Sequence, residues 1–162
     1  MERPSRPNNQ SLNTIIYSDF LNTFESHPIT HNLIRTVNKE SVKQAIRNLL
    51  LTNSMERLYK PDMGPDIYKV LFENVLDDGE KSLLRDRIAN NIKLYEPRVE
   101  LINVELLTAI DIGKSTNINT GAILTERDFK NDSENTLMIN VIFRIINTNE
   151  QLSLNVLLER SR

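Results

Sequence analysis

Residues 77–110 read DDGEKSLLRDRIANNIKLYEPRVELINVELLTAI, and this stretch decides the fold. Asp77-Asp78-Gly79 breaks the chain and offers an acidic cap to a helix that Pro97 ends. The helix carries one face of Leu84, Ile88, Asn91, Ile92 and Tyr95. After Pro97 the period changes from 3.6 residues to 2, which predicts one long strand. Its alternating residues are Ile102, Val104, Leu106, Thr108 and Ile110.

Two more helices are predicted before this stretch. The first begins near Asn38, a suitable N-cap, and ends near residues 52–53. Its apolar face follows the helical spacing through Val42, Ala45, Ile46, Leu49 and Leu50. The second helix starts at Pro65, since proline suits the first helical position. Its apolar stripe comprises Tyr68, Leu71, Phe72 and Val75. Pro61 and Gly64 interrupt regular structure, so a structural loop is predicted between the two helices.

Two further strands follow the decisive stretch. The first alternates through Leu137, Ile139, Val141, Phe143 and Ile145, and the second through Leu152, Leu154, Val156 and Leu158. The turn cluster at residues 147–150 joins them as a hairpin. The connection over residues 113–134 exceeds what a hairpin needs, and residues 122–125 are a candidate short strand within it. Helices followed by strands predict an α+β fold, with about three helices packed on a small antiparallel sheet of about three main strands.

The chain length suits one domain with a sizeable core. Residues 1–16 are predicted as an N-terminal arm, because they begin with a stretch rich in Pro, Asn, Ser and Arg. Residues 17–162 are predicted as a single domain. Up to residue 37 the apolar residues follow no sustained period, so that segment is expected to be irregular, with at most one short helix or strand.

Composition argues against several classes of function. The formal net charge is −2, and no basic run exceeds two residues, so neither nucleic acid nor an anionic membrane is an expected partner. Cysteine is absent, which excludes disulfides, thiolate metal sites and cysteine nucleophiles. No apolar run approaches the ~20 residues that a membrane span needs. We therefore expect a soluble protein without a cofactor. The lack of cysteine suits folding in a reducing cytoplasm and also permits other compartments.

Catalytic motifs are weak. His27 and His31 have i, i+4 spacing, but Pro28 lies between them, so two surface histidines are expected rather than a metal site. Gly113-Lys114-Ser115 lacks the upstream glycine of a phosphate loop. The carboxylate pairs Asp77/Asp78, Glu100/Glu105 and Glu126/Asp128 have the chemistry of a glycosidase, yet nothing marks a cleft around any of them. The residues therefore predict neither an enzyme nor a small-molecule binding site.

Tyr95-Glu96-Pro97-Arg98 stands out, because it places an anion and a cation on either side of a forced helix stop. Arg98 can bond the last helical carbonyls or a carboxylate of another protein. Glu96 lies at the negative end of the helix dipole, which is unfavourable unless it is paired. The residues alone favour a local Glu96–Arg98 pair at the surface, and a contact with a partner remains the alternative.

This motif, extended to Val99 and leading into a long strand, resembles the signature of the small baseplate wedge family of contractile phage tails, which type VI secretion baseplates share. Further blocks match in the same order. They are YSDF at residues 17–20, SVKQAIRNLL at 41–50, residues 52–57 with PDMG at 61–64, and LFEN at 71–74. The resemblance runs from about residue 17 to the C-terminus.

The resemblance implies a non-enzymatic structural protein of the virion baseplate, assembled in the host cytoplasm. Family members resemble the interlocking domain of the sheath subunit and begin the first sheath ring by strand exchange. The implied partners are the tail sheath subunit, larger wedge proteins, and inner baseplate or tail tube proteins. Tyr95, Glu96, Pro97 and Arg98 would bind a larger wedge protein. We therefore expect Arg98→Ala to leave the domain folded while baseplate assembly fails.

The last strand is the candidate for strand exchange, through the edge that carries Leu152, Leu154, Val156 and Leu158. An unpaired strand edge offers N–H and C=O groups that a partner strand can complete. The opposite possibility is an edge that is covered or blunted by charge, for example by Glu159 and Arg160. Two alternative functions stay open: a type VI secretion baseplate component, and a peptidoglycan hydrolase, since older descriptions call some family members lysozyme-like.

Overall fold

The computed structural model describes residues 15–71, 77–108 and 136–159. Their contacts group the chain into two units, residues 1–42 and residues 43–162. The predicted division into an arm (1–16) and one domain (17–162) stays a prediction. Several predicted features lie outside the described residues: Phe72, Val75, Ile110, the strand at 122–125, Gly113 to Ser115, and the pair Glu126/Asp128.

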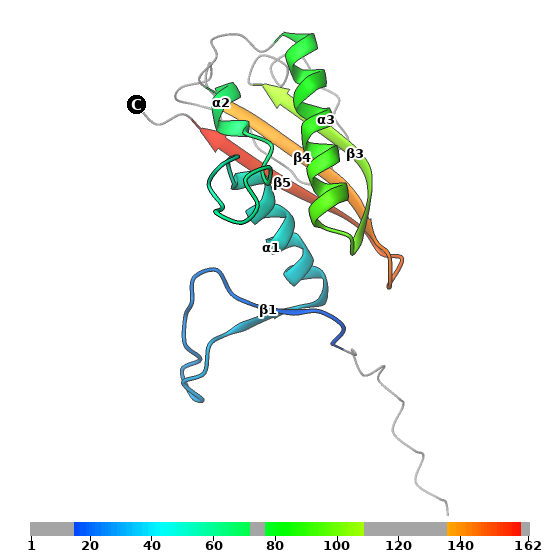
Figure 1. Cartoon of the computed structure of the whole chain (residues 1–162). Helices are drawn as coiled ribbons and strands as arrows, with labels where there is room; N and C mark the ends of the chain where they lie inside the picture. The colour runs from blue at the N-terminus through cyan, green and yellow to red at the C-terminus, as the bar shows by residue number, and fades with distance from the viewer. Residues whose placement is uncertain (1–14, 72–76, 109–135, 160–162) are drawn as a thin grey trace, which may run out of the picture. The chain divides into compact units, whose positions relative to one another are not determined.

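The second unit is an α+β fold, as the sequence predicts. Helix α1 (Asn38–Leu51) enters it from the first unit, and α2 (Ile67–Leu71) and α3 (Asp78–Tyr95) follow. Then come β3 (Val99–Thr108), β4 (Thr136–Ile145) and β5 (Gln151–Glu159). The three strands form an antiparallel sheet in the order β3-β4-β5, and α3 runs alongside β3 (Figure 1). None of the helices in the described ranges is long and apolar enough to cross a bilayer.

Helix α3 begins and ends where the sequence predicts. Asp77 is its N-cap, and the side chains of Asp77 and Glu80 form a capping box that satisfies N–H groups at the helix start. Its buried side chains are Leu84, Ile88 and Ile92, each 1% exposed or less. In β4, alternate residues are also 2% exposed or less: Leu137, Ile139, Val141, Phe143 and Ile145. The helix and the middle strand thus supply much of the core.

Strand β3 departs from simple alternation. Its register against β4 shifts between Leu101 and Asn103, so the strand contains a bulge at Ile102, whose side chain is 44% exposed. The prediction that Ile102 shares a face with Val104 and Leu106 is therefore wrong. The bulge inserts one residue, so Val99 on one side of it and Val104 on the other both point into the core.

Helix α2 is shorter than predicted and turns a different face inward. Ile67 and Val70 are buried, whereas Tyr68, expected in the apolar stripe, is 36% exposed. The helix begins two residues after Pro65, because Asp66 adopts a positive φ of 57° that no right-handed helix contains. This later start sets which side chains face the core.

The first unit contains a small hairpin, where the sequence predicts an irregular segment with at most one short helix or strand. Strands β1 (Ser18–Phe20) and β2 (Arg35–Val37) pair antiparallel, and an isolated bridge joins Ser26 to Leu33. In the intervening loop, the His27 ring nitrogen Nδ1 accepts the N–H groups of residues 29 and 30. Large apolar side chains of this unit stay exposed, among them Ile15, Phe24 and Ile29 at 63%, 69% and 81%. A hairpin of this size is marginally stable by itself.

Candidate interaction site at the end of α3

The turn that leaves α3 folds Arg98 back onto Glu96. The Glu96 N–H still donates to the Ile92 carbonyl at 2.9 Å, and the Glu96 carbonyl accepts the Val99 N–H at 3.3 Å. Pro97 occupies the exposed corner between them. Arg98 Nε lies 2.5 Å from Glu96 Oε1, and its Nη2 lies 2.6 Å from Oε2. This two-pronged geometry is the strongest form of a guanidinium–carboxylate pair.

The pair is not a surface pair. Glu96 is 5% exposed, and the Arg98 side chain is 30% exposed. The Arg98 carbonyl also accepts the Ile146 N–H at 3.0 Å, which ties this turn to the start of the β4–β5 connection. The sequence correctly suggested a local pair, but nothing in it revealed that the carboxylate is buried. The role of Tyr95, Glu96, Pro97 and Arg98 in binding a partner stays a prediction.

The loop over residues 53–66 lies against the same end of α3. Lys60 Nζ sits 5.7 Å from the centre of the Tyr95 ring, a cation–π distance. One turn earlier on the helix, the Asn91 side-chain oxygen accepts the Gly64 N–H at 2.8 Å. The loop and the helix end therefore belong to one continuous surface of the second unit.

Gly64 occupies a position that excludes a side chain. Its φ is +114°, and an added Cβ would lie 2.2 Å from the Thr52 carbonyl oxygen. Elsewhere in the loop, the Pro61 carbonyl accepts the Met55 N–H at 2.8 Å, and Glu56 accepts the Asn53 N–H at 2.8 Å. Pro61 and Gly64, chosen from the sequence as structural residues, thus both lie at close backbone contacts.

Asp66, at the end of the loop, accepts hydrogen bonds from Ser54 near its beginning. Its carboxylate accepts the Ser54 N–H at 2.8 Å and the Ser54 hydroxyl at 2.6 Å, and Lys69 Nζ lies 3.0 Å away. Burial by itself would raise the pKa of Asp66. The hydrogen bonds from Ser54 and the ammonium of Lys69 outweigh burial and hold the pKa below its usual value.

Replacing Asp66 by Asn is expected to lower the free energy of unfolding at pH 7 by about 1–2 kcal/mol, because hydrogen bonds to a charged acceptor are lost. Because the pKa of Asp66 is lower in the folded state, its ionised carboxylate stabilises the fold at pH values above the unfolded-state pKa. This contribution is lost as the pH falls through the folded-state pKa. The variant should therefore lose less stability than the parent below about pH 4. Urea unfolding at several pH values measures both effects. Asn tolerates the positive φ of this position.

Asp62→Asn is the matched control, since Asp62 is exposed in the same loop. We expect it to change neither the free energy of unfolding at pH 7 nor the way in which that free energy decreases at acid pH. Equal behaviour of the two variants would show that Asp66 does not hold the loop.

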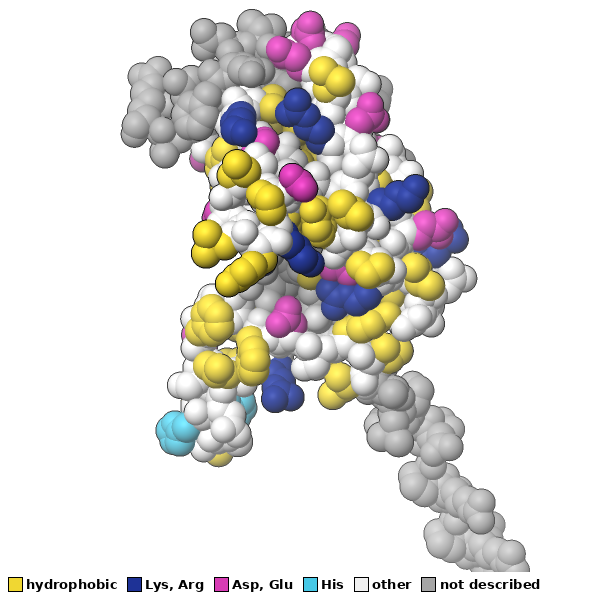
Figure 2. Space-filling model, in the orientation of Figure 1, with side chains coloured by type: hydrophobic (Ala, Val, Ile, Leu, Met, Phe, Trp, Pro, Cys, Tyr) yellow, Lys and Arg dark blue, Asp and Glu magenta, His cyan; other side chains and the backbone are white. Residues whose placement is uncertain are grey.

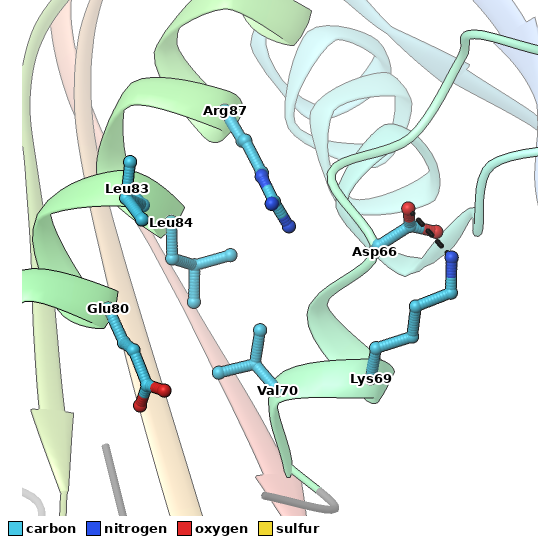
Figure 3. Close-up of a pocket in the computed structure, with 7 residues that line it drawn as sticks. All are labelled: Asp66, Lys69, Val70, Glu80, Leu83, Leu84 and Arg87. Atoms are coloured by element: carbon cyan, nitrogen blue, oxygen red, sulfur yellow. Dashed lines mark hydrogen bonds and ion pairs between the residues drawn. The ribbon is translucent and has the colours of Figure 1, made fainter. Parts of the chain in front are cut away.

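A cavity of about 480 Å³ lies between α2 and α3 (Figure 3). Two of its lining carboxylates are already engaged: Asp66 with Ser54 and Lys69, and Glu80 in the capping box of α3. Neither is an isolated acid in an apolar cleft, as a glycosidase acid would need to be. The remaining lining residues are Val70, Leu83, Leu84 and Arg87.

The other carboxylate pairs also lie in ordinary surroundings. Glu100 faces Arg144 at 3.5 Å, and Glu105 accepts side-chain amide N–H groups of Asn103 and Asn140 at 3.2 and 3.0 Å. Glu100 and Glu105 are thus partnered by different residues of the sheet. Across the three described ranges, no group of His, Cys, Asp and Glu is arranged to hold a metal ion.

Strand β5 is an edge of the sheet formed by the described strands. Its residues Leu154, Val156 and Leu158 are buried, and Leu152 is half-buried. These side chains fill the protein's own core, so a partner strand would pair through the main chain rather than through them. The four residues stay candidates for strand exchange.

Comparisons with known proteins place these features in context. Residues 36–150 match the model of a family described as baseplate wedge protein gp25. The fold is similar to a candidate tail lysozyme from Geobacter sulfurreducens, with a TM-score of 0.58, 21% identity, and coverage of 81% of this chain and 98% of that one. It is also similar to a chain in the baseplate of the anti-feeding prophage, with a TM-score of 0.51, 26% identity, and coverage of 57% and 72%. No curated protein matches the chain.

Proposed function

The chain belongs to the baseplate wedge protein gp25 family, and from this premise we propose that it binds larger wedge proteins through the end of α3 and starts the sheath on β5. Membership of the family makes it a baseplate component. Our proposal adds the docking surface, the first sheath contact and a location in the virion baseplate, assembled in the host cytoplasm. Its partners would be the larger wedge proteins, the sheath subunit, and inner baseplate or tube proteins.

The Glu96–Arg98 pair carries the proposal. A buried carboxylate that holds both prongs of a guanidinium fixes the plane of Arg98 at an exposed corner of the chain. The exposed 30% of the Arg98 side chain, together with Pro97, is what a partner would meet. An oriented guanidinium loses little conformational freedom on binding, which favours charge-assisted hydrogen bonds to a partner's carboxylate or carbonyl groups.

The double variant Glu96→Met/Arg98→Met tests docking separately from folding. Replacing both members of a buried ion pair by apolar side chains of similar volume is often neutral for stability. We therefore expect a folded chain whose affinity for purified wedge proteins of the same tail falls about 30-fold or more. Thermal unfolding and calorimetric titration measure the two properties.

Glu100→Met/Arg144→Met is the matched control, because it removes an ion pair of exposed side chains, 64% and 43% exposed, from the same sheet. It should bind as the parent does. A folded Glu96/Arg98 double variant that binds normally would refute the docking role. In the reconstituted complex with sheath subunits, a cryo-EM map should show a sheath strand beside β5, and a sheath contact elsewhere would refute that part of the proposal.

The chain is proposed to act without catalysis. The carboxylates of the α2–α3 cavity serve the loop and the helix cap, which supports a structural role. The likeness to a candidate tail lysozyme, at 21% identity, concerns the fold alone. A role in a type VI secretion baseplate is the second candidate, since the family is described by its baseplate position rather than by one kind of particle.

A further inference from the structure

The loop between α1 and α2 holds two large apolar side chains almost completely in solvent. Leu58 is 93% exposed and Tyr59 is 96% exposed, the highest values among the large hydrophobic residues that the structure describes. They stand at the tip of the loop, between Arg57 and Lys60. Figure 2 shows hydrophobic side chains gathered over the region that Figure 1 assigns to this loop.

The loop is braced along its length. The Lys60 N–H donates to the Arg57 carbonyl at 3.2 Å, which closes a turn around the two apolar residues. On the far side of the tip, the Met63 N–H donates to the Lys60 carbonyl at 3.1 Å. The Ser54–Asp66 bonds and the bond from Gly64 to Asn91 hold the base of the loop. The tip is therefore held away from the core rather than collapsed onto it.

An exposed apolar tip contributes nothing to the stability of the free chain, because burial is what makes apolar surface favourable. A preorganised tip does favour binding, since less freedom is lost on contact. Tyrosine and arginine are also enriched among residues that dominate binding energies. These properties fit an anchor that enters a pocket of another protein.

The neighbouring charges specify that pocket. Arg57 precedes Leu58, Lys60 follows Tyr59, and Arg57 forms no ion pair with any residue in the described ranges. A complementary pocket would be apolar at its floor and carry carboxylates at its rim. Glu56 and Asp62 balance the two cations over the loop as a whole, so an anionic membrane is the less favoured partner.

We propose that the Leu58-Tyr59 tip is a second anchor for the wedge protein that contacts the end of α3, and that it enters an apolar pocket edged by carboxylates. The proposal rests on the proposed docking function. The observation behind it is independent of the Glu96–Arg98 pair, because the tip belongs to the loop between α1 and α2. Lys60 lies over the Tyr95 ring, so this loop lies beside the end of α3. One partner can thus engage both elements.

The test compares Leu58→Ser/Tyr59→Ser with the parent chain, using purified larger wedge proteins of the same tail. Both side chains are exposed, so the thermal midpoint should not change. Affinity should fall about 30-fold or more, as for central binding residues. Leu83→Ser, at a position 60% exposed on α3, is the control and should bind as the parent does. In the parent complex, Tyr59 should be protected from hydroxyl-radical labelling.

The outcomes separate the two proposals. If the Glu96/Arg98 double variant loses binding while the tip variant binds normally and Tyr59 stays labelled, the tip proposal is wrong and the docking proposal stands. If the parent chain binds none of the wedge proteins, both proposals are wrong. If the parent chain binds vesicles of phosphatidylserine and phosphatidylcholine and the tip variant does not, the tip is a membrane element and the pocket is refuted.

Discussion

Replacing Arg98 by Ala is expected to lower the free energy of unfolding by about 3–5 kcal/mol, the range observed when one member of a buried ion pair is removed. Both Glu96 oxygens are bonded to Arg98, and Glu96 is 5% exposed. Without the guanidinium, the fold must either hold an unpaired buried charge or open the turn to water. Domains have total stabilities of about 5–15 kcal/mol, so the loss is a large fraction.

Two further substitutions identify the cause. Arg98→Lys keeps the charge but cannot bond both oxygens in one plane, so its stability should lie between those of the parent and the Ala variant. Adding Glu96→Met to Arg98→Ala removes the unpaired charge and should recover part of the loss. Urea unfolding followed by circular dichroism measures all three. An Arg98→Ala variant as stable as the parent would contradict the importance of the pair.

This expectation differs from the one that the sequence supports, in which Arg98→Ala leaves the domain folded. A surface pair contributes little, about 0–1 kcal/mol, and the sequence contains no sign that Glu96 is buried. For the same reason, a failure of the Ala variant to assemble could not separate docking from folding, whereas the double Met variant can.

Gly64→Ala is expected to lower the free energy of unfolding by about 2–6 kcal/mol, through backbone strain and steric overlap together. A φ of +114° is strained for any residue with a Cβ, at about 1–3 kcal/mol. Overlap in a closely packed site adds about 1–3 kcal/mol. The added carbon would lie 2.2 Å from the Thr52 carbonyl oxygen and 3.0 Å from the Asn53 carbonyl carbon. These are backbone atoms, so no change of rotamer relieves the overlap.

Gly79→Ala is the natural control for this substitution. Gly79 lies within α3, and an added Cβ would approach a side-chain oxygen of Asp77 at 3.3 Å. The helical preference of Ala opposes a slight disturbance of the cap, so the net change should stay below about 1 kcal/mol. Thermal and urea unfolding of both variants decide the matter. Equal effects would show that the close approach at Gly64 costs little.

The sequence predicts the second unit well where local signals agree. Capping residues before α3, its apolar face and Pro97 after it all indicate the same helix, and the structure confirms them. The alternation in β4 and β5 likewise survives in the paired register of the hairpin. In these elements, the local sequence signals predict the same face that the tertiary structure buries.

The misses have different physical causes. The bulge at Ile102 is defined by pairing with β4, and the inward face of α2 by the positive φ of Asp66. The hairpin of β1 and β2 has three-residue strands, too short for a visible period. At the candidate site, the motif was visible in the sequence, but the burial of Glu96 was not.

In the sequence, the tip of the loop is recognisable only as two apolar residues, Leu58 and Tyr59, shortly before Pro61. A loop leucine and a loop tyrosine fold inward in many proteins, and composition does not distinguish that case from full exposure. What keeps them outward is the brace at Gly64, Ser54 and Asp66, which joins residues separated along the chain.

The Glu96–Arg98 pair joins residues that are two apart in the chain, so its closure costs almost no loop entropy. The strands β3 and β4, by contrast, bring together positions as distant as Thr108 and Leu137. Contacts between near neighbours form quickly and survive local rearrangement elsewhere, whereas long-range pairings are slow to find. The pair that we propose as a docking contact is thus closed over a very short span of chain, unlike the long-range strand pairing that surrounds it.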